Sequence, residues 1–193
     1  MTSLLVEQEF LTYDKQLIEE ARDPNQTLVL RNVLLQRATA KNQNGRVYPR
    51  EVLLREVNRY RDEFVAQNRA LGELDHPESP VVNLRNVCAN VTRIDQQGDN
   101  VIGDIQILST PSGNIVRELI KNNIRLGISS RGLGSVRNMG ESTLEVQDDY
   151  NLICFDIVSN PSTHGAFINE GVTASTIVME LDSLIYDFLA EVE

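Results

Sequence analysis

Residues 150–158 read YNLICFDIV, and the glycine-rich stretch at 126–136 reads LGISSRGLGSV. Short runs of apolar and β-branched residues bounded by turn signals are typical of buried strands, so both stretches predict core strands. The run at 150–158 stops before Asn160 and Pro161, a pair that favours a turn. Asp156 lies inside this run, where a carboxylate is costly unless it meets a cation or several donors. A solvent-facing Asp156 is the alternative, because one face of a strand can be wet.

The other expected elements follow from the spacing of apolar residues. Further strands are indicated by apolar and β-branched residues at 27–40, 69–75 and 87–108. Residues 97–100, Gln-Gly-Asp-Asn, predict the turn of a hairpin inside the last of these stretches. Helices are indicated by helical spacing of apolar residues at 49–67, after the capping residues 110–112, and at 175–190. Because strands dominate and helices are interspersed, the fold class is α+β.

Composition limits the class of protein. The chain has 193 residues, of which 41% are hydrophobic and 24% charged, and this predicts one soluble globular domain. The net charge of -10 and the lack of a Lys/Arg cluster oppose nucleic-acid binding. We find no signal peptide and no apolar run of membrane-spanning length, and Cys88 and Cys154 match no zinc-ligand spacing. We therefore expect a cytosolic protein without metal, cofactor, membrane or nucleic-acid partner.

Residues 1–26 differ from the rest of the chain. They are acidic and polar apart from a few apolar positions, and Asp23-Pro24-Asn25 ends any helix that begins near Leu17. We interpret this segment as a polar leader and a candidate for removal. Residues 27–193 then form a single domain whose last element is the helix at about 175–190.

The candidate chemistry centres on a histidine and a serine. His76 lies in LGELDHP at 71–77, where Pro77 restricts the backbone just after it. Ser129 lies in GISSRGLGS at 127–135, and a serine becomes a good nucleophile only when a base takes its proton. From the residues alone, a surface histidine and a simple Gly/Ser turn stay open as alternatives.

Three ordered patches together resemble a known family. GELDHP at 72–77 is followed, 53 residues after its histidine, by the first serine of GISSRGLGS, and GRVYP at 45–49 precedes both. This order closely resembles the prohead core serine proteases of myovirus-type tailed phages, which look like distant relatives of herpesvirus assemblin. The resemblance implies a barrel-like, mostly antiparallel β-sheet flanked by helices, as in the herpesvirus proteases.

The resemblance also implies roles for individual residues. Ser129 takes the role of nucleophile, His76 that of general base, and Asp156 that of the group that orients the imidazole. Ser130 is the rival nucleophile, although a strand points it to the opposite face from Ser129. His164 is the rival third member. Arg131, or the loop that contains Gly165, is expected to support the oxyanion, and a surface charge is the plain alternative for Arg131.

The function implied by the resemblance is a serine endopeptidase of prohead maturation. It would cleave scaffold or core proteins, major capsid proteins and itself after glutamate in Leu/Ile-x-Glu sites, within the prohead in the host cytoplasm. Ile18-Glu19-Glu20 and Ile168-Asn169-Glu170 are candidate self-cleavage sites, in segments expected to be loops or termini. An inactive scaffold or capsid-assembly protein of the same fold is the alternative, and a homo-oligomer stays open.

Overall fold

The structure, a computed structural model, describes residues 3–42, 44–75, 77, 79–140 and 142–159. His76, His164, Gly165, Glu170 and the helix expected at 175–190 lie outside the described residues. The elements run in the order β1 (Ser3–Phe10), α1 (Lys15–Arg22), β2 (Leu28–Arg37), β3 (Arg46–Val47), α2 (Arg50–Tyr60), a π-helical turn η1 (Arg61–Val65), β4 (Leu71–Glu73), β5 (Val87–Gln97), β6 (Asn100–Ile107), α3 (Pro111–Lys121), β7 (Gly127–Gly134), β8 (Val136–Gly140), β9 (Thr143–Val146) and β10 (Asn151–Val158).

The described strands form three hydrogen-bonded sheets, in the orders β1-β7-β10, β2-β6-β5-β4 and β3-β9-β8. Neighbouring strands are antiparallel except β3 and β9. A single parallel bridge, Leu74 to Ile157, joins the first two sheets. The predicted α+β class with mostly antiparallel strands is confirmed. The barrel-like sheet does not close among the described residues, because β1 and β2 contact each other without a hydrogen-bond ladder.

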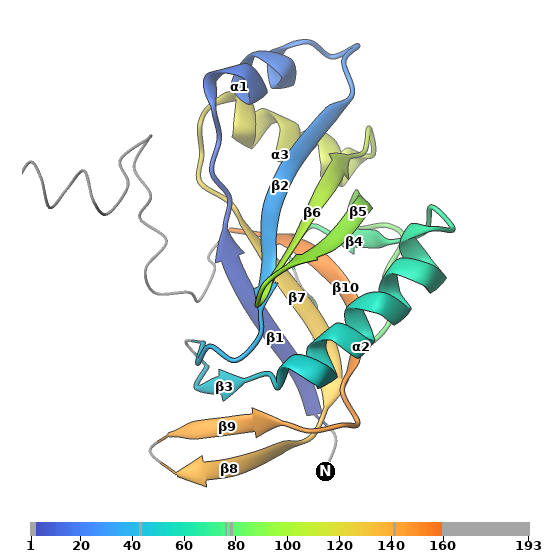
Figure 1. The fold of residues 1–193 in the computed structure, drawn as a ribbon. Coiled ribbons are helices and arrows are strands. Elements are labelled where there is room, and N and C mark those ends of the chain that lie inside the picture. The colour runs from blue at the N-terminus through green and yellow to red at the C-terminus, as the bar shows by residue number, and fades with distance from the viewer. Residues whose placement is uncertain (1–2, 43, 76, 78, 141, 160–193) are drawn as a thin grey trace, which may run out of the picture.

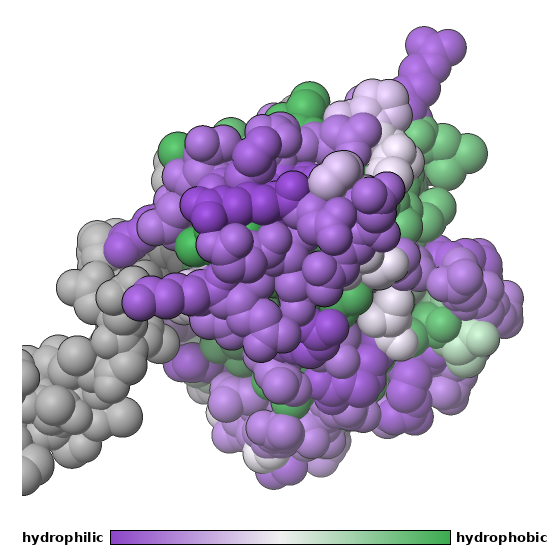
Figure 2. All heavy atoms as spheres, turned by 90° about the horizontal axis from the view of Figure 1, so that it is seen from above, coloured by the Kyte–Doolittle hydropathy of each residue, from purple (hydrophilic) through white to green (hydrophobic). Residues whose placement is uncertain are grey.

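The helices cover one end and one side of the sheets (Figure 1). α1 and α3 pack together at one end of the molecule, and the β3-β9-β8 sheet lies at the other end. α2 lies along β10 and also contacts β5. Figure 2 views the end that carries α1 and α3, where hydrophilic residues cover most of the surface. The apolar side chains are instead gathered in one core that draws on all of these layers, so the described residues form a single packed unit.

The segment interpreted as a polar leader contains two packed elements. β1 pairs with β7 along its whole length, from Ser3 opposite Gly134 to Phe10 opposite Gly127. α1 begins at the cap Asp14 and ends at Arg22, where the Asp23-Pro24 break was predicted. Sequence reasoning missed β1 and assigned the helix near Leu17 to a polar leader, because each element buries only a few apolar side chains, such as Leu5 and Leu17, among polar ones.

A buried arginine on α3 fixes the end of α1. Arg117 donates hydrogen bonds to the backbone carbonyls of residues 20, 21, 23 and 26. Glu20 and Ala21 are both buried within the helix. The expectation that Glu20 lies in a loop is therefore wrong, since its carbonyl is held inside a packed helix end.

A buried carboxylate fixes β1. Glu7 accepts hydrogen bonds from Arg46 at 2.9 Å, from the Tyr48 hydroxyl at 2.9 Å and from the Asn44 amide at 2.8 Å. Burial raises the pKa of the Glu7 carboxyl, and Arg46 opposes that rise. The GRVYP patch at 45–49 thus anchors the strand that lies beside β7.

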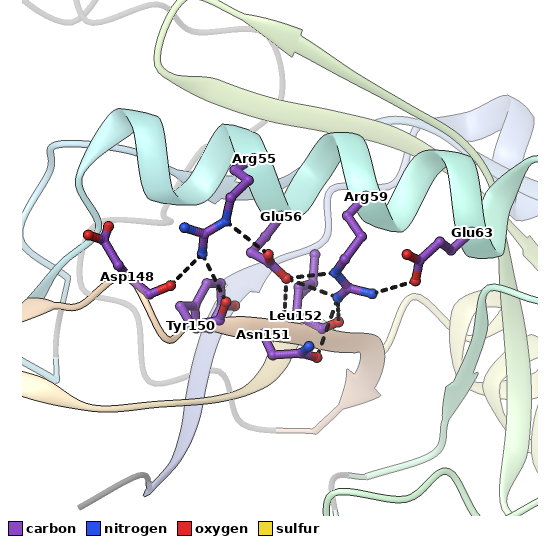
Figure 3. Close-up of polar contacts among 8 residues, drawn as sticks. All are labelled: Arg55, Glu56, Arg59, Glu63, Asp148, Tyr150, Asn151 and Leu152. Atoms are coloured by element: carbon purple, nitrogen blue, oxygen red, sulfur yellow. Dashed lines mark hydrogen bonds and ion pairs between the residues drawn. The ribbon is translucent and has the colours of Figure 1, made fainter.

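A second buried carboxylate ties α2 to the start of β10 (Figure 3). Glu56 accepts a hydrogen bond from the backbone N–H of Leu152 at 3.0 Å and another from Arg59 at 2.9 Å. Arg59 in turn donates to the Leu152 carbonyl, and Arg55 donates to the carbonyls of Asp148 and Tyr150. This clamp sets the position of the strand that carries Asp156.

The clamp gives a stability prediction. Glu56→Ala leaves the Leu152 N–H and the Arg59 guanidinium without their buried acceptor, so we expect a loss of about 2 kcal/mol in the free energy of unfolding. Glu63→Ala is the matched control, because Glu63 contacts the same Arg59 from an exposed position, and we expect a change within about 0.5 kcal/mol. Urea unfolding measures both. Equal losses in the two variants would contradict this account of the clamp.

Candidate active site

The two serines of β7 face opposite sides of the sheet. Ser129 lies directly opposite Asp156 of β10, and Ser130 lies opposite Phe155. Because directly opposed residues of antiparallel strands share a face, the side chains of Ser129 and Asp156 lie on the same face, with Cβ atoms about 5 Å apart. Both serines are buried, and neither hydroxyl has a hydrogen-bond partner among the described residues.

Asp156 is fully buried, so the alternative that it faces solvent is wrong. Its Oδ1 accepts hydrogen bonds from the backbone N–H of Glu73 at 2.9 Å and from Arg131 Nη2 at 3.2 Å, and Cys154 Sγ lies 3.4 Å away. Its Oδ2 lies 2.9 Å from Arg131 Nε, but no described residue donates a well-aligned hydrogen bond to it. The expected cation therefore exists, and one carboxylate oxygen keeps a free acceptor position within the described part of the chain.

Arg131 is the cation, and it is fully buried. Its guanidinium forms ion pairs with Glu73 and Asp156, both of which are also fully buried, and it donates to the backbone carbonyl of Ser79 at 2.7 Å. The alternative that Arg131 is a surface charge is wrong. Sequence reasoning also missed Glu73, although a glutamate in a short strand of the GELDHP motif was the available signal.

The charges of this cluster do not balance. Glu73 and Asp156 contribute two carboxylates and Arg131 one guanidinium, so the ionised cluster has one negative charge in excess. Burial raises the pKa of the Asp156 carboxyl, and Arg131 opposes the rise. Such a site would stabilise a cation that forms beside it.

Described residues on both sides of position 76 are hydrogen-bonded to β7 or β10. Before it, the backbone N–H of Asp75 donates to the Ile157 carbonyl at 2.8 Å, and Leu74 forms the bridge to Ile157. After it, the Ser79 carbonyl accepts from Arg131. These anchors place the two flanking segments at β7 and β10.

The close approach of β4 to β10 requires a glycine. A Cβ atom at Gly72 would lie 2.0 Å from the backbone oxygen of Phe155, well inside any allowed contact. Gly72 therefore lets the strand that leads to His76 lie against the strand that carries Asp156.

Other kinds of site are not indicated in the part of the chain that the structure describes. No group of three or more His, Cys, Asp or Glu side chains there could hold a metal ion. Within the same residues, no helix has the length and apolarity needed to cross a membrane.

Comparison with known proteins identifies the class. The sequence profile of the prohead core protein serine proteases matches residues 5–177, so the chain belongs to this family. It is a protease of phage prohead maturation, and the resemblance found in the sequence is confirmed at this level.

A curated relative and a solved structure, both from phage T4, are similar to the chain. The prohead core protein protease of Enterobacteria phage T4 is 29% identical over 161 residues, which are 81% of this chain and 74% of the relative. The solved structure of the bacteriophage T4 capsid assembly protease matches with a TM-score of 0.71 at 23% identity, over 83% of this chain and 99% of that one. The likeness of the two structures shows a shared fold.

The β4–β10 contact yields a second prediction. We expect Gly72→Ala to lower the free energy of unfolding by about 2 kcal/mol or more, because backbone must move to admit the methyl group. Hydrogen exchange at Asp75 should also become faster. Gly98→Ala is the control: its Cβ would meet nothing within 4 Å, and only its positive φ of 62° adds strain, worth about 1 kcal/mol. A smaller effect at Gly72 than at Gly98 would contradict the close contact.

Proposed function

We propose that the chain is a serine endopeptidase in which Ser129 is the nucleophile, His76 the general base and Asp156 the residue that orients the base. The observation that supports this best is the pairing of Ser129 with Asp156 on one face of the sheet. Ser129 Oγ and Asp156 Oδ2 are both buried and lack described hydrogen-bond partners. An imidazole has two nitrogens, so one can hydrogen-bond with Ser129 Oγ and the other with Asp156 Oδ2.

The anchors of the flanking residues support His76 as the source of that imidazole. Asp75 is bonded to the residue after Asp156, and Ser79 is bonded to the side chain of Arg131, two positions after Ser129. His76 directly follows Asp75 in the sequence, and Asp75 is hydrogen-bonded to β10. His164 remains the rival for the role of Asp156.

The proposed chemistry is acyl transfer in two steps. The imidazole takes the Ser129 proton as Oγ attacks the substrate carbonyl, and it then gives that proton to the leaving amine. Water, activated by the same imidazole, hydrolyses the resulting ester and frees Ser129. The excess negative charge of the Glu73, Arg131 and Asp156 cluster stabilises the imidazolium that forms in both steps.

The oxyanion is the second charge to be stabilised. The Arg131 guanidinium is engaged by Glu73, Asp156 and the Ser79 carbonyl, so its side chain is poorly placed to serve a substrate as well. This favours backbone N–H groups, of Arg131 itself or of the loop with Gly165, as the oxyanion donors. Ser130, on the other face of β7, is left as a residue that supports the strand.

The proposed substrates are the scaffold or core and major capsid proteins of the prohead, together with the chain itself, cut after glutamate in Leu/Ile-x-Glu sites. Of the two candidate self-cleavage sites, Glu170 is the better one. A protease cleft takes extended backbone, whereas Glu20 is buried in α1 with its carbonyl held by Arg117. Cleavage after Glu20 would require the end of α1 to unfold first.

The proposal predicts different outcomes for the two serines. A synthetic peptide that copies residues 165–174, GAFINEGVTA, should be cut after its glutamate by the wild-type chain. Ser129→Ala should abolish the cut and the self-cleavage seen by intact-mass measurement, while far-ultraviolet circular dichroism stays unchanged. Ser130→Ala should keep most of the activity.

Loss of activity in Ser130→Ala alone would show that Ser130 is the nucleophile. Failure of the folded wild-type chain to cut the peptide, a core protein or itself would favour an inactive scaffold of the same fold.

A further inference from the structure

The charged side chains buried beside Ser129 carry a desolvation cost that apolar side chains in the same place would not carry. Arg131, Glu73 and Asp156 are each fully buried, and removing a charged group from water costs several kcal/mol before pairing offsets it. Replacing such groups by apolar ones often leaves stability unchanged or improves it. Strong burial of coupled charges next to a candidate nucleophile is more typical of a functional site.

The guanidinium of Arg131 joins three segments that are distant in the sequence. One ion pair reaches Glu73 at the end of β4, another reaches Asp156 on β10, and a hydrogen bond reaches the carbonyl of Ser79 after the His76 position. Arg131 itself stands two residues after Ser129 on β7 and so shares its face. A planar fork with several donors can hold these acceptors together, which a lysine ammonium cannot do in the same geometry.

We propose that Arg131 is a positioning residue of the protease, and that its ion pairs with Glu73 and Asp156 and its hydrogen bond to the Ser79 carbonyl hold the two described segments that flank position 76, at 73–75 and at Ser79, against the nucleophile strand. This inference rests on the proposed function and assigns to Arg131 and Glu73 roles separate from the triad. Arg131 acts through the segments that it holds and not on the substrate. Glu73 supplies the negative charge that remains in excess after Arg131 and Asp156 have paired.

Among the described residues, the other ionisable groups that interact with Asp156 are two thiols and a phenol. Cys154 lies on the same strand, Cys88 comes from β5 and Tyr60 from α2. Burial raises the pKa of the Cys88 thiol to about 12 and raises the pKa of Cys154 and Tyr60 well above their ordinary values. These groups stay neutral near pH 7, so Glu73, Arg131 and Asp156 set the charge of the cluster.

The first test uses Arg131→Lys, which keeps the positive charge but loses the planar guanidinium and its several donors. In hydrogen exchange, the amides of residues 71–75 should exchange at least tenfold faster than in the wild-type chain, whereas those of the β5–β6 hairpin should not change. In labelling by a fluorophosphonate, the maximal rate should fall at least tenfold with the concentration for half-maximal rate nearly unchanged. Unchanged exchange, or an unchanged maximal rate in an active wild-type background, would overturn the proposal.

The second test uses Glu73→Gln, which keeps the shape and removes one negative charge. A nearby carboxylate stabilises the imidazolium, so its loss should lower the pH at the midpoint of the labelling profile by at least about half a pH unit. Glu56→Gln is the matched control, since Glu56 is also a buried carboxylate that bonds β10 and two arginines but belongs to the α2 clamp. Glu56→Gln should lower the free energy of unfolding and leave the pH at the midpoint of the labelling profile unchanged.

A midpoint that is the same in Glu73→Gln and the wild-type chain would overturn the role of Glu73. If the wild-type chain is not labelled, the proposed function fails, and the hydrogen exchange of Arg131→Lys still decides whether Arg131 holds these segments.

Discussion

The buried ion pairs of Arg131 with Glu73 and Asp156 are the interaction on which the arrangement of this molecule depends. They join β4, β7 and β10 at the place where two sheets meet through the single Leu74–Ile157 bridge. Three unscreened charges cannot be separated there without leaving at least one buried and unpaired, which would cost several kcal/mol. The junction is therefore rigid for electrostatic reasons, and the strand that carries the candidate nucleophile is fixed with it.

The rest of the fold positions this junction from outside. The Glu56 clamp sets the start of β10 from α2, and Glu7 with Arg46 sets β1 along the other side of β7. Both use a buried carboxylate that bonds an arginine: Glu7 bonds Arg46 of β3, whereas Glu56 bonds Arg59 of its own helix and the backbone of β10. A buried carboxylate that bonds an arginine occurs three times around this sheet. These contacts fix β1 and β10 on either side of β7, so the polar side chains of β7 have little freedom to move.

Much of the sheet could be predicted from sequence, because strands such as 150–158 and the hairpin at 87–108 combine apolar alternation with clear turn signals. The packing of β1 and α1 could not be predicted from sequence. These elements are buried by contacts with β7 and α3, which are distant in the sequence, and their own sequences contain few apolar residues. The same limit applies to the site. The cost of burying Asp156 predicted a cation, but only the register of β7 and β10 identifies Arg131, and only the approach of β4 adds Glu73. Whether the barrel-like sheet closes could not be predicted either, because closure depends on a ladder between β1 and β2, and no local sequence pattern indicates that pairing.

The proposed mechanism depends on one step, in which an imidazole from His76 activates Ser129 on the face that Ser129 shares with Asp156. Peptide mapping of a fluorophosphonate adduct by mass spectrometry tests it most directly, because the reagent marks only a serine that a base has activated. The adduct should lie on Ser129 in the folded wild-type chain and should be absent from folded His76→Ala. An adduct on Ser130, or equal labelling of Ser129 without His76, would contradict this mechanism.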